Sequence, residues 1–114
     1  MTTATNAPSV TIPERISVPA TQPEAYQQAL TLAAAIARSD LERSLIDLID
    51  VRVSQINGCA FCLEMHTSAA RRRRASDARL HALNAWEEAS VFTARERAAL
   101  ALAEAITLIR DGHV

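Results

Sequence analysis

Apolar and polar positions follow one another along most of this chain with the period of an α-helix. From Thr21 onward, apolar side chains recur every three or four residues, and no run alternates convincingly with the two-residue period of a strand. The pattern therefore predicts an all-α domain of about five helices. We expect helices over residues 23–38, 40–56 and 59–74, a short fourth helix that carries Leu80, Leu83 and Trp86, and a fifth that begins after Thr93 with Leu102, Ile106 and Ile109 on its apolar face.

The first twenty residues depart from this pattern. They contain three of the four prolines of the chain, with Thr, Ser and Asn between them. We interpret residues 1–20 as an extended arm and residues 21–114 as a single helical domain. The arm also has apolar members, which suggests that it packs against another surface such as a neighbouring subunit: Val10, Ile12, Ile16 and Val18.

Short local signals predict where the helices begin and end. A hydroxyl residue followed three positions later by Glu is the pattern of a capping box, in which each side chain bonds the other residue's backbone N–H. Asn57 and Gly58 predict the end of the second helix, because glycine readily adopts the left-handed conformation that closes a helix. Ser76 is a candidate N-cap of the fourth helix. Three capping boxes are expected, at Thr21 with Glu24, Ser39 with Glu42, and Thr93 with Glu96.

Composition narrows the class of protein. Apolar residues make up 49% of the chain, charged residues 22%, and the net charge is −1, so no global field points to nucleic acid or to a membrane surface. The four arginines at 71–74 fall at a helix end and are expected to be a solvated cationic terminus rather than a nucleic-acid site. No apolar run approaches the roughly 20 residues that span a bilayer. The N-terminus lacks the pattern of a secretory signal, so we expect a cytoplasmic protein.

One stretch, GCAFCLEMHT at 58–67, carries candidate chemistry. Cys59 and Cys62 are the only cysteines, and His66 follows four residues after the second. On a helix these three positions cover an arc of roughly 60°, so their side chains share one face. Backbone N–H groups at a helix start favour a thiolate, and an imidazole one turn away can accept a thiol proton. The spacing favours a dithiol redox pair with a base.

Two other interpretations of the same stretch stay open. Two cysteines and a histidine are also three zinc ligands, with Asp47 or Glu64 as a fourth. Alternatively, the thiols are buried and inert beside an unrelated histidine. Zinc more often stabilises small, loop-rich modules, whereas five amphipathic helices need no metal to form a core. The helix-start location and the shared face favour redox chemistry.

Two blocks of the sequence resemble the alkyl hydroperoxidase AhpD-like branch of the carboxymuconolactone decarboxylase superfamily. They are VSQINGCAFCLEMHT at 53–67 and the later segment with LNAW, RERAAL and LAEA, and the resemblance covers roughly residues 20–110. It implies an all-α domain that assembles into homo-oligomers, often trimers or hexamers. It also implies a CxxC centre that reduces hydroperoxides, needs no cofactor or metal, and is recycled by a dithiol electron donor.

The resemblance also implies roles for individual residues. Cys59, Cys62 and His66 match the motif of the family, in which an acidic residue stands twelve positions before the first cysteine. That residue is Asp47 here, where the family has Glu, and its shorter side chain is expected to reach His66 or Cys59 only through water. Asp47 would orient His66 or shuttle a proton. Cys62, nearest His66, would be the peroxidatic cysteine, although the start of the helix favours Cys59.

The sequence therefore predicts a thiol-dependent hydroperoxide reductase. The alternative is a non-catalytic oligomeric module of the same fold that binds zinc through Cys59, Cys62 and His66 or senses redox state.

Overall fold

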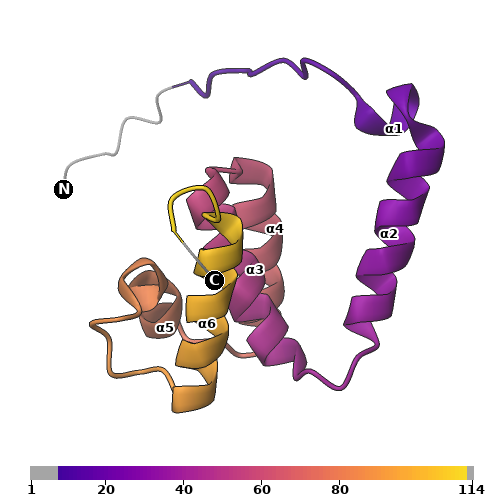
Figure 1. Cartoon of the computed structure of the whole chain (residues 1–114). Helices are drawn as coiled ribbons and strands as arrows, with labels where there is room; N and C mark the ends of the chain where they lie inside the picture. The colour runs from indigo at the N-terminus through magenta and orange to yellow at the C-terminus, as the bar shows by residue number, and fades with distance from the viewer. Residues whose placement is uncertain (1–7, 113–114) are drawn as a thin grey trace. The chain divides into compact units, whose positions relative to one another are not determined.

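The computed structural model describes residues 8–112, and every regular element in that range is helical (Figure 1). The chain divides into two compact units, one up to Ser39 and one from Asp40 onward. No helix in the described range is long and apolar enough to cross a membrane. The first unit contains α1 (Val18–Thr21) and α2 (Pro23–Ala37), and the second contains α3 (Arg43–Asn57), α4 (Ala60–Arg72), α5 (Asp77–Ala82), the 3₁₀ helix η1 (Leu83–Ala85) and α6 (Ala94–Thr107).

The first unit is a stretch without helix or strand over residues 8–17, followed by α1 and α2. The sequence pattern did not predict α1, which has a proline in its first two positions. The capping box expected at Thr21 is wrong, because the Thr21 hydroxyl donates backward to the Ser17 carbonyl oxygen at 2.8 Å. The residue that caps α2 is Gln22, which makes no side-chain capping bond.

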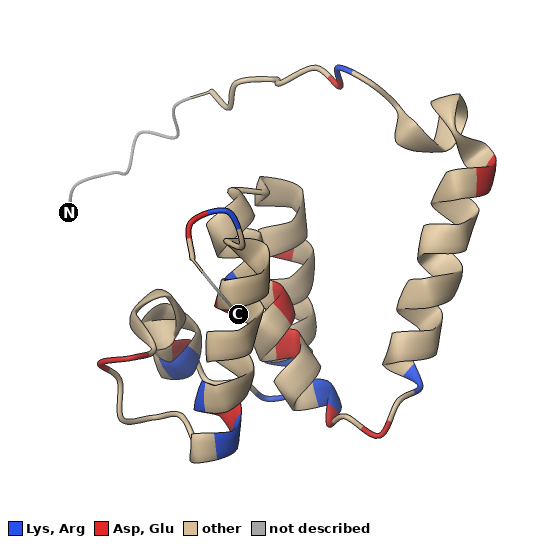
Figure 2. Cartoon of the chain, viewed as in Figure 1, with Lys and Arg blue, Asp and Glu red and all other residues tan. Residues whose placement is uncertain are grey.

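The surface of α2 is almost free of charge. Between Glu24 near its start and Arg38 just after its end, the sequence has no ionisable side chain except the Tyr26 phenol, and Figure 2 shows the helix without charged residues over that length. The helix buries no residue. Its large apolar side chains are exposed, namely Tyr26, Leu30, Leu32 and Ile36. Such an uncharged helix is typical of a surface that another surface covers.

The second unit is built around α3, which packs against α4, α6 and η1. Leu48 and Val51 supply the apolar face of α3, and Leu100 on α6 packs against them with its side chain fully buried. Leu102, Ile106 and Ile109, the expected apolar face of the fifth helix, are instead exposed. The buried core consists of Leu48, Val51, Ala70, Leu80, Leu83, Trp86, Phe92 and Leu100.

Trp86 follows η1 and ties this region to two helices. Its indole Nε1 donates to Glu104 Oε1 on α6 at 2.9 Å, and the same oxygen accepts from Arg52 Nε on α3 at 2.6 Å. The Arg97 guanidinium lies over the indole, 5.4 Å from the ring centroid, and donates to the Trp86 carbonyl oxygen at 2.9 Å. A buried indole with its N–H satisfied is a strong packing anchor.

Three of the predicted helix signals of this unit are confirmed and one is wrong. Gly58 closes α3 in the left-handed conformation with φ 62°, and the Ser76 hydroxyl caps α5 by accepting from the Arg79 N–H at 3.3 Å. Thr93 and Glu96 form the expected capping box. The box expected from Ser39 with Glu42 is absent, because α3 begins at Arg43 and the residue before it makes no side-chain capping bond.

The turn between α3 and α4 is a Schellman motif. The Gly58 N–H donates to the Gln55 carbonyl oxygen at 3.2 Å, and the Cys59 N–H donates to the Ser54 carbonyl oxygen at 3.1 Å. These bonds satisfy carbonyls at the end of α3 and reverse the chain in two residues. The turn therefore fixes both the start of α4 and its antiparallel packing on α3.

Replacing Gly58 by Ala is expected to destabilise the protein by about 1 kcal/mol, the cost of the left-handed conformation for a residue with a Cβ. An added Cβ would meet no atom within 4 Å, so backbone strain alone causes the loss. Urea unfolding measures it. Gly112→Ala is the matched control, because its Cβ also meets open space and its backbone is not left-handed. Equal stabilities of the two variants would contradict the prediction.

Glu96 should make stability depend on pH in the acid range. Burial raises its pKa, but hydrogen bonds from the Thr93 backbone and Arg79 outweigh burial, so its pKa lies below the ordinary value of 4.5. A lowered carboxyl pKa gives stability that is present at neutral pH and is lost as pH falls through the folded value. We expect Glu96→Gln to cost on the order of 1 kcal/mol at neutral pH and progressively less in acid.

Urea unfolding of wild type and Glu96→Gln at several pH values measures this convergence. Glu88→Gln, which changes an exposed carboxylate in the same way, should follow the wild type throughout. A loss in Glu96→Gln that stays constant down to strongly acid pH would refute the assignment.

Candidate functional site

Cys59 and Cys62 form a disulfide at the start of α4, with their Cα atoms 5.3 Å apart. Cys59 is the N-cap, one residue earlier than the first-turn position expected from the sequence, and Cys62 is the third residue of the helix. The Cys59 Sγ accepts a hydrogen bond from the Cys62 N–H at 3.2 Å. Both residues are half-buried. In the reduced protein the same N–H and the helix terminus would stabilise a thiolate at Cys59.

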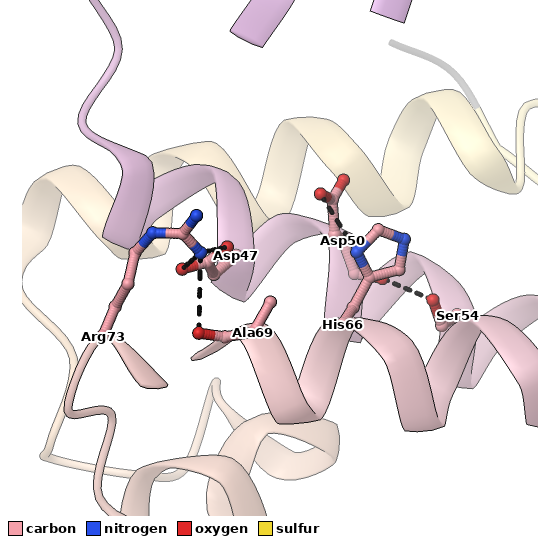
Figure 3. Close-up of polar contacts among 6 residues, drawn as sticks. All are labelled: Asp47, Asp50, Ser54, His66, Ala69 and Arg73. Carbon is pink, nitrogen blue, oxygen red and sulfur yellow. Dashed lines mark hydrogen bonds and ion pairs between the residues drawn. The ribbon is translucent and has the colours of Figure 1, made fainter. Parts of the chain in front are cut away.

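His66 lies one turn further along α4 and contacts a carboxylate on α3. Its Nδ1 is 3.4 Å from the Asp50 Oδ2, and both side chains are partly open to solvent, at 28% and 39% (Figure 3). The imidazole therefore has an acidic partner on one side while it stands on the same helix as both sulfurs. That His66 serves the two cysteines as a base stays a prediction.

Asp47, the carboxylate expected to serve His66, lies elsewhere. It is buried, and both its oxygens accept from Arg73 Nη1, at 2.8 and 2.9 Å (Figure 3). Among the described residues, Asp47 makes no direct hydrogen bond or ion pair with His66, and the predicted link through water stays a prediction. Because α4 runs antiparallel to α3, the end of α4 lies opposite Asp47 and its middle lies opposite Asp50. The register of the two helices therefore assigns the carboxylates to different partners.

The arginines at 71–74 differ in their contacts and in their backbone conformation. Arg71 pairs with the exposed Asp77 at 2.9 Å, whereas Arg73 turns inward to Asp47. Arg74 adopts a left-handed backbone with φ 67° after the end of the helix. Successive side chains thus point in different directions, as expected for a helix terminus.

Asp50 is the site residue that the sequence analysis missed. Burial raises its pKa, the nearby Asp47 raises it further, and the attraction of His66 and Arg43 offsets part of that rise. The net effect is a carboxyl that holds its proton more readily than an ordinary aspartate. The signal in the sequence was its position three residues after Asp47, on a helix face directed at α4.

The zinc interpretation finds no support in the geometry of residues 8–112. Within that range, no group of three or more His, Cys, Asp or Glu side chains is arranged to hold a metal ion. The two cysteine sulfurs are bonded to each other, and Asp47, one of the two expected fourth ligands, is paired with Arg73.

Comparison with known proteins gives one family match and two informative relatives. The profile of the carboxymuconolactone decarboxylase family matches residues 23–105. The chain is 41% identical over 101 residues to YdfG of Bacillus subtilis (strain 168), an uncharacterised protein, with 89% of this chain and 69% of YdfG covered.

A solved structure shares the fold. It is ATU0492 from Agrobacterium tumefaciens, a protein of unknown function whose name carries a suggested assignment as the antioxidant defence protein AhpD. The TM-score is 0.79 at 37% identity, with 85% of this chain covered. The chain spans 66% of the length of that protein, slightly less than two thirds.

The family profile covers most of the chain, and the helices superpose on those of a relative with an AhpD-like name. The chain therefore belongs to the carboxymuconolactone decarboxylase family, in its AhpD-like branch.

Proposed function

We propose that the protein is a thiol-dependent hydroperoxide reductase. The observation that carries the proposal is the pairing of Cys59 with Cys62 at the start of α4, one turn before His66. A dithiol that closes into a disulfide without unfolding its helix can pass two electrons to an acceptor. The suggested antioxidant assignment of the Agrobacterium relative agrees with a peroxide as that acceptor.

The proposed reaction begins at Cys62, the cysteine one turn before His66. Its thiolate attacks the peroxide, so that a sulfur–oxygen bond forms and the oxygen–oxygen bond breaks. His66, which accepted the thiol proton, returns it to the departing alkoxide to give an alcohol. Cys62 is left as a sulfenic acid.

The second step uses Cys59. Its sulfur attacks the sulfenic acid, the disulfide forms, and the hydroxyl leaves as water with the proton of the Cys59 thiol. One hydroperoxide and two thiols thus give one alcohol, one water and the disulfide. An external dithiol donor then reduces the disulfide by thiol–disulfide exchange and returns both thiols.

The same proposal includes assembly into a homo-oligomer, with a trimer as the first expectation. The apolar side chains of α2 are exposed, and the helix has no charge between Glu24 and Arg38. Exposed apolar surface of this kind is typical of an interface between subunits. The apolar residues of the N-terminal segment from Val10 to Val18 are exposed as well.

Reduced protein is expected to consume a hydroperoxide in a dithiol-supported assay and to end as an intramolecular disulfide. Mass spectrometry without reductant should show the loss of two hydrogens per chain. Cys62→Ser should abolish turnover, because the attacking sulfur is absent. Cys59→Ser should stop after one step and leave a sulfenic acid that dimedone traps at Cys62.

Two results would count against this function. One is peroxide consumption by the reduced wild type no faster than by the dithiol alone. The other is a dominant intermolecular disulfide after oxidation. If dimedone traps a sulfenic acid at Cys59 in Cys62→Ser and none at Cys62 in Cys59→Ser, then Cys59 is the attacking cysteine and the function is unchanged.

Light scattering at tens of micromolar protein should give a mass near three times the chain mass of 12.4 kDa. Leu30→Gln together with Ile36→Gln should lower that mass, because both changes place polar groups on the apolar surface of α2. Gln27→Asn with Gln28→Asn keeps α2 uncharged and leaves its apolar side chains in place, so it is the control, with no expected change. A wild type that runs as a monomer would contradict the assembly.

A further inference from the structure

Asp50 is the carboxylate that faces the histidine of the dithiol site. Its Oδ2 lies 3.4 Å from His66 Nδ1, across the packed faces of α3 and α4 (Figure 3). We infer that Asp50, rather than Asp47, is the positioning residue of the site, which holds His66 by Nδ1 and orients its imidazole. The inference rests on the proposed function, since it assigns the partner of the proposed base.

Asp47 is unsuited to this role because it already has a full partner. Both its oxygens accept from Arg73, its side chain is only 5% exposed, and it lies one helical turn away from Asp50. Turning Asp47 toward His66 would leave the Arg73 guanidinium without its carboxylate and would break the two hydrogen bonds that the buried Asp47 accepts. Its contribution is to join the end of α4 to α3.

Asp50 is more accessible than Asp47 and lies among charged groups of two helices. Its side chain is 39% exposed, whereas that of Asp47 is 5% exposed. The charged groups that act on it are His66 from α4 and Asp47 and Arg43 from its own helix. Burial and repulsion by Asp47 raise the pKa of Asp50, and the attraction of His66 and Arg43 offsets part of that rise.

Hydrogen bonds at the end of α3 connect the backbone of Asp50 to the start of α4. The Asp50 carbonyl oxygen accepts from the Ser54 hydroxyl at 2.6 Å, and the Ser54 carbonyl oxygen accepts from the Cys59 N–H at 3.1 Å. Ser54 therefore links the backbone of Asp50 to that of Cys59 at the end of α3.

The part that His66 plays in the proposed reaction depends on which of its two ring nitrogens faces Asp50. With Nδ1 directed at Asp50, Nε2 is the nitrogen that exchanges a proton with the Cys62 sulfur. The proton leaves the thiol, resides on the imidazole while the carboxylate balances its charge, and passes to the alkoxide that the peroxide releases. Asp50 keeps no proton at the end of the step, so the stoichiometry of the proposed reaction is unchanged.

Asp50→Asn tests the inference on the full-length, reduced protein. The amide keeps the shape of the side chain but cannot balance an imidazolium. We expect the pH–rate profile of iodoacetamide alkylation to move to higher pH, and peroxide reduction to fall on the order of 10- to 100-fold, the range seen when a functional histidine loses its carboxylate partner. Asp50→Glu should recover part of both, because the longer acid can still reach His66.

A second readout does not require peroxide activity. In the oxidised protein, ¹³C NMR follows the titration of the Asp50 carboxyl, whose pKa lies above its ordinary value. His66→Ala removes the attraction of the imidazolium and should raise that pKa further. Asp47→Asn removes a repelling charge and should lower it. An Asp50 titration that is the same in His66→Ala and wild type would overturn the inference.

Asp77→Asn is the matched control, since it makes the same chemical change at an exposed aspartate paired with Arg71. It should leave the pH–rate profile of alkylation unchanged, whereas a general effect of lost negative charge would shift the profile in both variants.

The inference would be overturned if the alkylation profiles of Asp50→Asn and wild type superpose. It would also be overturned if Asp47→Asn shifts the profile more than Asp50→Asn does. If the Asp50 and His66 variants shift the titrations and the thiol profile while the wild type consumes no peroxide, the pair stands and the proposed function falls.

Discussion

The left-handed turn at Gly58 is the constraint on which the candidate site depends. A residue with φ 62° ends α3, its neighbour donates back to Ser54, and α4 begins one residue later. This reversal sets the first cysteine at the cap of α4 and lays that helix antiparallel on α3. Because only two residues make the turn, the register between the two helices has little freedom. Every contact between the α3 carboxylates and α4 follows from that register.

The register between α3 and α4 gives the two aspartates of α3 different partners and different degrees of burial. Asp47 and Asp50 lie one turn apart on one helix face, yet the first is buried against Arg73 and the second is open to solvent beside His66. A buried carboxylate held by both oxygens costs much to move and contributes rigidity. Asp50 is half-buried, and only one of its oxygens is paired with the imidazole, at 3.4 Å. Burial and the number of partners decide the difference, since the side chains are chemically identical.

The redox pair draws on backbone features that exist before any substrate arrives. The Cys59 sulfur accepts an N–H at the start of α4, where the backbone donors of a helix are otherwise unpaired. The same donors would favour a thiolate after reduction. Under the proposed function, oxidised and reduced forms would use the same helix terminus, so the bond could form and break with the helix in place. Membership of the carboxymuconolactone decarboxylase family agrees with a helical frame of this kind.

The sequence by itself determined the features that depend on neighbouring residues. Helical periodicity, the capping box of Thr93 and Glu96, the Ser76 cap and the Gly58 turn are local, and the structure contains each of them. The alignment of Cys59, Cys62 and His66 is likewise a property of one helix. Tertiary structure decided what depends on packing between helices. It buried Leu100 rather than Leu102 on α6, because leucines two positions apart on a helix point roughly 200° apart and only the docked face shows which one meets α3. Tertiary structure also placed His66 beside Asp50 and Arg73 beside Asp47. The two aspartates lie one turn apart on α3, so the partner of each depends on which turn of α4 lies opposite it. Spacing along the chain does not contain that information.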